Sequence, residues 1–130
     1  MKESGQLIMI ADQDPYVRDM VSRFIFEAGY RVTVAAQGYE ALDDARKLLP
    51  AAIMADIMLP KLDGLALCRL LKSDPATEGI ITVIVFSVLS AEERARNAGA
   101  DGFILKPLEK SRVLNVLGQA IVKGPQNGQA

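Results

Sequence analysis

Five short runs of apolar residues alternate along the chain with segments in which apolar residues recur every three or four positions. The continuous runs are typical of strands covered on both faces, whereas the wider spacing predicts amphipathic helices. The strands are expected at residues 7–11, 31–35, 52–55, 80–86 and 103–105. Strict alternation of strands and helices predicts a parallel sheet with helices on both faces and right-handed crossovers.

Turn and capping residues mark the ends of the expected helices. Asp14 before Pro15 predicts a helix start, with the carboxylate as N-cap and proline at the first helical position. The other boundary residues are Gly29, Gly38, Pro50, Ser90 and Gly99, and the apolar stripes of the third and last helices lie at 65–71 and 113–121. Ser90 begins a capping-box pattern, and the polar segment from Gly124 to Ala130 predicts a frayed tail.

Composition narrows the class of protein. The chain has 130 residues, half of them hydrophobic, which predicts one domain spanning 1–130, with its core at about 7–122 and a tail at 123–130. Its 15 basic and 16 acidic residues argue against direct nucleic-acid binding. The single cysteine, Cys68, excludes an internal disulfide, and the absence of histidine excludes His-based catalysis and His metal ligands. Because the chain has neither a signal-peptide pattern nor an apolar run of about 18 residues, we expect a cytoplasmic protein without membrane contact.

Four of the five expected strands are followed or ended by a polar side chain: Asp12, Asp56, Ser87 and Lys106. Each of these residues has an ordinary interpretation alone: Asp12 as a helix-start acid, Asp56 as a turn acid, Ser87 as a capping hydroxyl and Lys106 as a solvated lysine. The carboxyl ends of parallel strands share one edge of the sheet, where ligands bind in open α/β folds. Two carboxylates suit a hard divalent cation and a phosphoryl acceptor, and a hydroxyl and an ammonium suit phosphoryl oxygens.

These motifs resemble the receiver domain of two-component response regulators. The resemblance rests on Asp12 after the first strand, on Asp56 followed by Pro60 and Asp63-Gly64, and on Ser87 after the fourth strand. It also rests on the segment 100–107, which ends in Lys106-Pro107, and it extends over residues 7 to about 121. The resemblance implies a flavodoxin-like doubly wound sheet of order 2-1-3-4-5 with five flanking helices.

The resemblance also implies roles for individual residues. Asp56 would be the phosphoryl acceptor, with Asp12 and the backbone carbonyl of Met58 around Mg²⁺. Ser87 would hydrogen-bond the phosphoryl group and Lys106 would pair with it, so Asp56, Ser87 and Lys106 are the catalytic candidates. Phe103 stands at the position of the family's switch aromatic, and the Lys106–Pro107 bond would be cis. The implied partners are a histidine kinase or phosphotransfer protein and a downstream protein or output domain, and two copies could pair through the last two helices and the fifth strand.

The chain departs from the family pattern at Gln13. The family usually has a second acid there as a direct metal ligand, and glutamine keeps an oxygen but loses the charge, so weaker Mg²⁺ binding and slower phosphorylation are expected. Asp14 could reach the site through a shifted loop, although its place before Pro15 favours capping. Val88 stands where the family prefers Ala or Gly, which would narrow access to the site.

Two further functions are consistent with the sequence. Gln13 is consistent with a degenerate receiver that acts as a phosphorylation-independent interaction domain. The spacing of Asp12 and Asp14 also matches the Asp-x-Asp of haloacid dehalogenase-type phosphatases, with Asp12 as nucleophile, although the chain is short and offers no cap domain.

Overall fold

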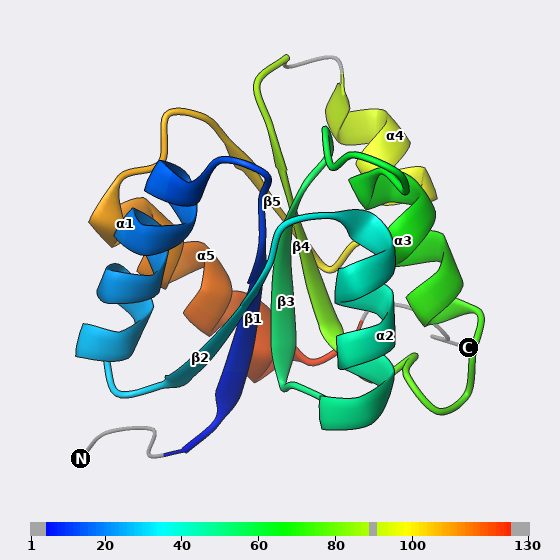
Figure 1. Ribbon diagram of the computed structural model, residues 1–130, viewed down its shortest axis with the longest axis horizontal. Helices are drawn as coiled ribbons and strands as arrows, with labels where there is room; N and C mark the ends of the chain where they lie inside the picture. The colour runs from blue at the N-terminus through cyan, green and yellow to red at the C-terminus, as the bar shows by residue number, and fades with distance from the viewer. Residues whose placement is uncertain (1–4, 89–90, 126–130) are drawn as a thin grey trace.

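A computed structural model describes residues 5–88 and 91–125, and its centre is a five-stranded parallel sheet (Figure 1). The strands are β1 (Leu7–Ala11), β2 (Arg31–Ala35), β3 (Ala52–Asp56), β4 (Ile81–Phe86) and β5 (Gly102–Leu105). Their order is β2-β1-β3-β4-β5, as the resemblance implied, so the flavodoxin-like fold class is confirmed. Ser90, the first residue of the predicted capping box, lies outside the described residues, as do residues 126–130, which are most of the predicted frayed tail.

Five helices cover the two faces of the sheet (Figure 1). They are α1 (Pro15–Glu27), α2 (Gly38–Leu48), α3 (Gly64–Lys72), α4 (Ala91–Asn97) and α5 (Lys110–Lys123). Helices α1 and α5 lie on one face, and α2, α3 and α4 lie on the other. Among the described residues, no helix combines the length and the apolar character that crossing a bilayer requires.

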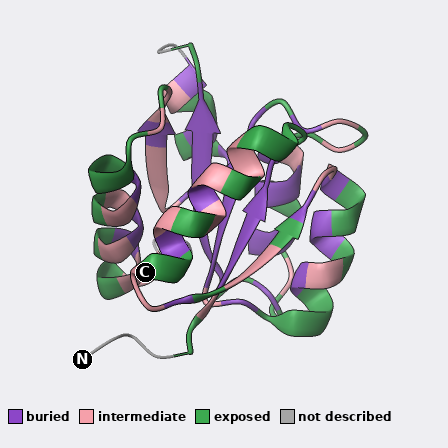
Figure 2. Cartoon of the chain, turned by 60° about the vertical axis from the view of Figure 1, so that its left-hand side comes forward, coloured by how far each residue is buried: buried purple, intermediate pink, exposed green. Residues whose placement is uncertain are grey.

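Side-chain alternation along the strands divides the core into two clusters. In β1, Ile8 and Ile10 pack with α1 and α5, whereas Met9 and Ala11 pack with α2 and α3. Strands β3 and β4 are buried along their whole length, as the continuous apolar runs predicted. Figure 2 shows buried strands between the helices. The edge strand β2 is more exposed, because it has a neighbour on one side only.

The same alternation sorts the polar residues at the strand ends. The four strand-end residues each stand two positions after a residue of the core cluster that packs against α1 and α5. They are Asp12 after Ile10, Asp56 after Met54, Ser87 after Val85 and Lys106 after Ile104. Because successive side chains along a strand point to opposite faces, all four are directed to the face of the sheet that α1 and α5 cover. Phe103 points to the opposite face and packs against the core cluster formed with α2, α3 and α4.

A few element boundaries differ from the sequence prediction. β4 begins at Ile81, because Ile80 donates its N–H to the carbonyl of Thr77 and so belongs to the preceding turn. β3 extends to Asp56, and the next N–H, that of Ile57, still bonds the carbonyl of Val85. α5 begins three residues before the first residue of the predicted stripe, because its first turn is polar and exposed.

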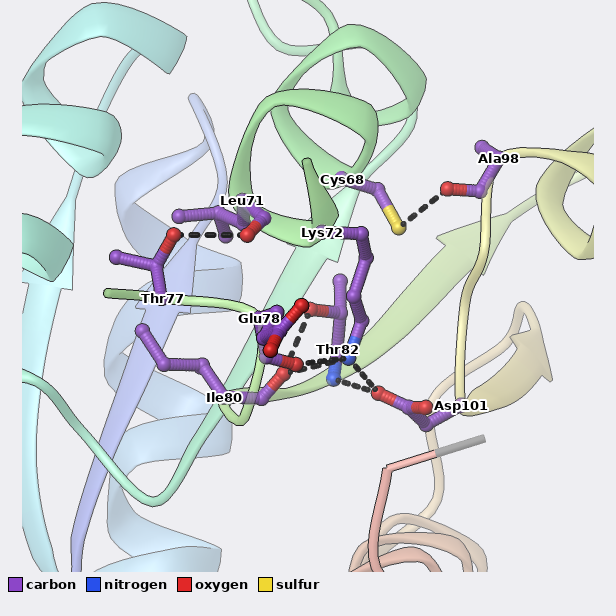
Figure 3. A network of polar contacts seen from close by, with 9 residues as sticks. All are labelled: Cys68, Leu71, Lys72, Thr77, Glu78, Ile80, Thr82, Ala98 and Asp101. Carbon is purple, nitrogen blue, oxygen red and sulfur yellow. Dashed lines mark hydrogen bonds and ion pairs between the residues drawn. The ribbon is translucent and has the colours of Figure 1, made fainter. Parts of the chain in front are cut away.

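A buried ion pair lies at the edge of the sheet where the strands begin, opposite the edge that carries Asp12 and Asp56 (Figure 3). Lys72 Nζ, at the end of α3, lies 2.6 Å from Asp101 Oδ2 and donates to the carbonyls of Glu78 and Ile80 at 3.1 and 2.9 Å. The same Asp101 oxygen accepts the backbone N–H of Thr82 at 2.8 Å. The pair therefore joins α3, the segment that enters β4 and the segment that enters β5.

Candidate functional site

Asp56 lies at the carboxyl end of β3, in the middle of the sheet. The residue is 7% exposed. Its Oδ1 accepts the backbone N–H of Met58 at 3.0 Å, and its Oδ2 accepts a hydrogen bond from Lys106 Nζ at 2.9 Å. The carboxylate is thus held in place by contacts on both of its oxygens, with an ammonium on the side that faces β5.

Asp12 lies beside Asp56 after the end of β1 and is 4% exposed. Its Oδ1 accepts the N–H of Asp14 at 2.9 Å, and its Oδ2 lies 3.9 Å from Lys106 Nζ. Both carboxylates line a small hollow whose other walls are apolar, including Val17 and Leu108. Burial raises the pKa of Asp12 above its ordinary value, and the neighbouring charge of Asp56 adds to this shift.

Lys106 follows β5, and its ammonium group lies near both carboxylates. Its side chain is about one third exposed. Partial burial acts to lower the pKa of Lys106, but its hydrogen bond to Asp56 and the charges of Asp56 and Asp12 outweigh burial and raise the pKa. The Lys106–Pro107 peptide bond is cis, as the resemblance implied. The ammonium therefore remains charged and offsets part of the repulsion between the two acids.

Ser87 and Phe103 lie on opposite faces of the sheet. Ser87 follows β4 at the same edge as the carboxylates, and its side chain is exposed, as is that of Val88. Phe103 is half-buried, and the guanidinium of Arg96 in α4 lies over its ring, 4.9 Å from the centroid. Arg96 also pairs with Glu92 at 2.7 Å, so this arginine connects the surface of α4 to the candidate switch residue.

The loop between β1 and α1 is fixed by several contacts, of which the sequence predicted only the Asp14 cap. Arg18 Nη1 donates to the carbonyl of Asp12 at 2.7 Å, and the N–H of Asp12 bonds the carbonyl of Ala35 at 3.1 Å. Asp14 Oδ1 accepts the N–H of Tyr16 at 2.9 Å, so Asp14 is the N-cap of α1, as predicted. That cap contact weakens the phosphatase alternative, which needs Asp14 as a second acid of the site.

Gln13 contacts the residue that was expected to provide the backbone ligand for a cation. Its Nε2 donates a hydrogen bond to the carbonyl oxygen of Met58 at 3.4 Å, at the exposed mouth of the site. The sequence indicated only that a charge was missing at this position. The contact joins the loop after β1 to the loop after β3, 45 residues apart in the chain.

The oxygen atoms at this edge are of the kind that Mg²⁺ binds. Mg²⁺ in proteins is commonly held by one or two carboxylates and completes its octahedron with water and phosphate oxygens. The site offers the carboxylates of Asp12 and Asp56 and the carbonyl of Met58. Across residues 5–88 and 91–125, no cluster of three or more Asp, Glu, His or Cys side chains is placed to hold a metal, so a cation here would depend on this smaller set.

Gly64 allows the start of α3 to approach the acceptor strand closely. A Cβ atom at this position would lie 2.5 Å from the carbonyl oxygen of Asp56 and 2.9 Å from Cα of Ile57. Asp63 caps the helix by accepting the N–H of Ala66 at 2.8 Å. The Asp63-Gly64 pair, predicted as a turn before a helix, therefore also supports the backbone beneath Asp56.

Comparisons with known proteins show which family this chain resembles. The family model of the response regulator receiver domain matches residues 8–118. The DNA-binding dual master transcriptional regulator RpaA of Synechocystis sp. is 34% identical over 109 residues, which are 82% of this chain and 45% of that protein. The response regulator MprA of Mycobacterium sp. (strain KMS) is 35% identical over 107 residues, which are 82% of this chain and 46% of that protein. The chain thus spans about half the length of these curated relatives.

Solved structures match over almost the whole chain. A putative response regulator from Chloroflexus aurantiacus has a TM-score of 0.88 at 30% identity, covering 92% of this chain and 99% of that one. The receiver domain of a sensor histidine kinase from Pseudomonas aeruginosa, solved with a magnesium ion coordinated in its active-site cleft, has a TM-score of 0.84 at 24% identity, with coverage of 92% and 99%. The second likeness supports the fold alone. With the family model matching most of its length, the chain belongs to the receiver domains of two-component response regulators.

Proposed function

We propose that this chain is a phosphoacceptor signalling module of a two-component phosphorelay, in which Asp56 receives the phosphoryl group. The observation that supports this most strongly is the meeting of Asp12, Asp56 and Lys106 at one edge of the sheet, with Lys106 Nζ 2.9 Å from Asp56 and 3.9 Å from Asp12. We further infer that residues 7–122 form one receiver domain. The curated relatives are about twice as long as this chain, and the second partner we propose is an output domain or a downstream protein.

The residues of the site would divide the work of phosphoryl transfer. Asp12, Asp56 and the Met58 carbonyl would hold Mg²⁺, which when bound supplies positive charge against the phosphoryl oxygens. Lys106 would pair with the Asp56 carboxylate in the resting state and move its ammonium to a phosphoryl oxygen after transfer. The arrangement would thus supply charge stabilisation and positioning, the two contributions on which phosphoryl transfer depends most.

The donor would be a phosphohistidine of a histidine kinase or phosphotransfer protein. A carboxylate oxygen of Asp56 would attack phosphorus, so that a P–O bond forms while the P–N bond breaks. The electron pair of the broken bond would remain on the donor imidazole, which then takes a proton. The product is an acyl phosphate on Asp56 and a free histidine on the donor.

The acyl phosphate would change the surface formed by α4 and β5. The Ser87 hydroxyl would donate a hydrogen bond to the phosphoryl group, and movement of the β4–α4 segment would let Phe103 reorient. Arg96 lies on the Phe103 ring and would move with it. The same surface would bind the downstream partner, and it is where two copies would pair if the protein dimerises.

Phosphorylation can be tested directly with a small-molecule donor. Incubation with acetyl phosphate and Mg²⁺ should add the mass of one phosphoryl group, measured on the intact protein, and Asp56→Asn should abolish the gain. Asp43→Asn is the matched control, because Asp43 is an exposed acid on α2. An unchanged gain in Asp56→Asn would refute Asp56 as the acceptor, and no gain in the parent protein would argue against the module as proposed.

The alternative function is a phosphorylation-independent interaction domain. It is favoured by one observation, the bond between Gln13 Nε2 and the Met58 carbonyl, which occupies a cation ligand with a neutral donor. Titration with millimolar Mg²⁺ separates the two functions. If the backbone amide spectrum around Asp56 and Met58 does not respond, the interaction domain is the better explanation.

A further inference from the structure

We infer that Gln13 is a latch on the cation site: its side-chain amide closes the site by binding the Met58 carbonyl, and a cation must displace it. This inference rests on the proposed function, since it concerns the same cation site. It differs from the loss of a ligand charge, because it assigns Gln13 an active opposing role. Gln13 is then a positioning residue that sets the concentration of Mg²⁺ at which the site fills.

The first support is the direction of the hydrogen bond. Gln13 Nε2 donates and Met58 O accepts, at 3.4 Å. An amide NH₂ group carries partial positive charge, whereas a cation ligand must present an oxygen. The side chain therefore turns the wrong end of its amide toward the position that a cation would share with the Met58 carbonyl.

The second support is that the two loops joined by Gln13 are each fixed independently. On the β1 side, Asp12 is held through its carbonyl by Arg18 Nη1 at 2.7 Å and through its Oδ1 by the N–H of Asp14 at 2.9 Å. On the β3 side, Met58 donates its N–H to Asp56 Oδ1 at 3.0 Å. With both backbones held, rotation of the Gln13 side chain can open the latch without moving either carboxylate.

The third support is the position of the latch at the mouth of the site. The Gln13 side chain is exposed, and Met58 is 66% exposed, so the bond closes the site on its solvent side. Asp12 and Asp56, which are buried, lie behind it. An arriving cation thus meets the amide before it reaches the carboxylates.

Removing the latch distinguishes this inference from the simple loss of a ligand. If Gln13 opposes the cation, Gln13→Ala should bind Mg²⁺ more tightly than the parent chain, by roughly two- to tenfold, which is the range for releasing one neutral hydrogen bond. If Gln13 supplies a ligand oxygen, the same variant should bind more weakly. Gln13→Asp should bind more tightly than Gln13→Ala by at least about tenfold, because a carboxylate adds charge to the ligand set.

The experiment is an Mg²⁺ titration of the full chain, followed by backbone amide shifts and by calorimetry. Gln6→Ala serves as the control, because Gln6 is exposed at the far end of β1. A metal-free spectrum provides a second readout: Gln13→Ala should shift the amide nitrogen of Leu59, which shares its peptide group with the Met58 carbonyl. Equal or weaker Mg²⁺ binding by Gln13→Ala, or an unchanged Leu59 signal, would overturn the latch.

The outcomes separate this inference from the proposed function. If Gln13→Asp binds Mg²⁺ and Gln13→Ala gains nothing over the parent, the latch is refuted and the cation site stands. If neither the parent nor any Gln13 variant binds Mg²⁺, the cation site itself is refuted, and with it the latch and the phosphoacceptor proposal.

Discussion

Replacing Lys72 with methionine should destabilise the fold more than any exposed charge change in the molecule. The Lys72 and Asp101 side chains are 4% and 0% exposed, and Lys72 Nζ donates to the Asp101 carboxylate and to the carbonyls of Glu78 and Ile80 (Figure 3). Methionine keeps most of the side-chain volume but removes the ammonium. The buried carboxylate and two carbonyls then lose that donor, which costs about 3–5 kcal/mol when one partner of a buried ion pair is removed.

This cost is a large part of the free energy of unfolding of a domain, which is about 5–15 kcal/mol. With a urea m-value of about 2 kcal/mol/M, Lys72→Met should lower the urea midpoint by roughly 2 M, as measured by circular dichroism. The matched control is Lys110→Met, which removes an exposed pair with Glu27 at 3.4 Å and should change the free energy of unfolding by about 1 kcal/mol or less.

A double-mutant cycle tests whether the loss comes from the pair itself. The double variant Lys72→Met with Asp101→Asn should lose less free energy of unfolding than the two single variants lose together. The reason is that Asp101→Asn removes the buried charge that Lys72→Met leaves without its ammonium. A Lys72→Met midpoint no lower than that of Lys110→Met would refute the reasoning. Strict additivity in the cycle would show that the two residues act separately.

Three other changes test different parts of the structure. Burial raises the pKa of Asp12 above its ordinary value of 3.8, so ionised Asp12 destabilises the folded state at neutral pH, and this effect decreases as the pH falls toward 3.8. Asp12→Asn should therefore raise the urea midpoint at pH 7 in metal-free buffer. Near pH 4 the urea midpoints of the variant and the parent protein should no longer differ for this reason. Burial raises the pKa of the Cys68 thiol to about 12, so at pH 8 it should react with an aromatic disulfide reagent only after unfolding in urea; rapid reaction of the native protein, followed by absorbance, would contradict this. Gly64→Ala should cost about 1–3 kcal/mol in urea unfolding, because its Cβ would lie 2.5 Å from the Asp56 carbonyl oxygen, whereas Gly118→Ala, with open space around it in α5, should not destabilise the fold.

The fold could be predicted because every strand carries a local signal. The runs at β1, β3 and β4 are continuously apolar since helices cover both faces of these strands, and capping residues such as Asp14 mark helix starts through contacts two residues away. The meeting of Asp12, Asp56 and Lys106 was also foreseeable, because parallel strands align their carboxyl ends. Boundaries were less certain: Ile80 is apolar and β-branched but belongs to a turn.

The parts that escaped prediction depend on contacts between distant segments. Lys72 and Asp101 lie 29 residues apart, and neither has a local pattern that indicates a buried partner. Arg18 looks like an exposed helical arginine in the sequence, yet it holds the carbonyl of Asp12. Gln13 could be recognised only as a missing charge, because its contact with the Met58 carbonyl depends on how two loops approach each other.

The placement of the four strand-end residues on one face of the sheet also limits how this protein can evolve. These residues are Asp12, Asp56, Ser87 and Lys106. Each points to the face covered by α1 and α5 because it lies two positions after a core residue on that face. Inserting or deleting one residue in β3 or β5 would turn Asp56 or Lys106 to the opposite face and invert the core of that strand at the same time. Lineages descended from this sequence should therefore accumulate substitutions within these strands, while changes in length are confined to the segments outside the strands.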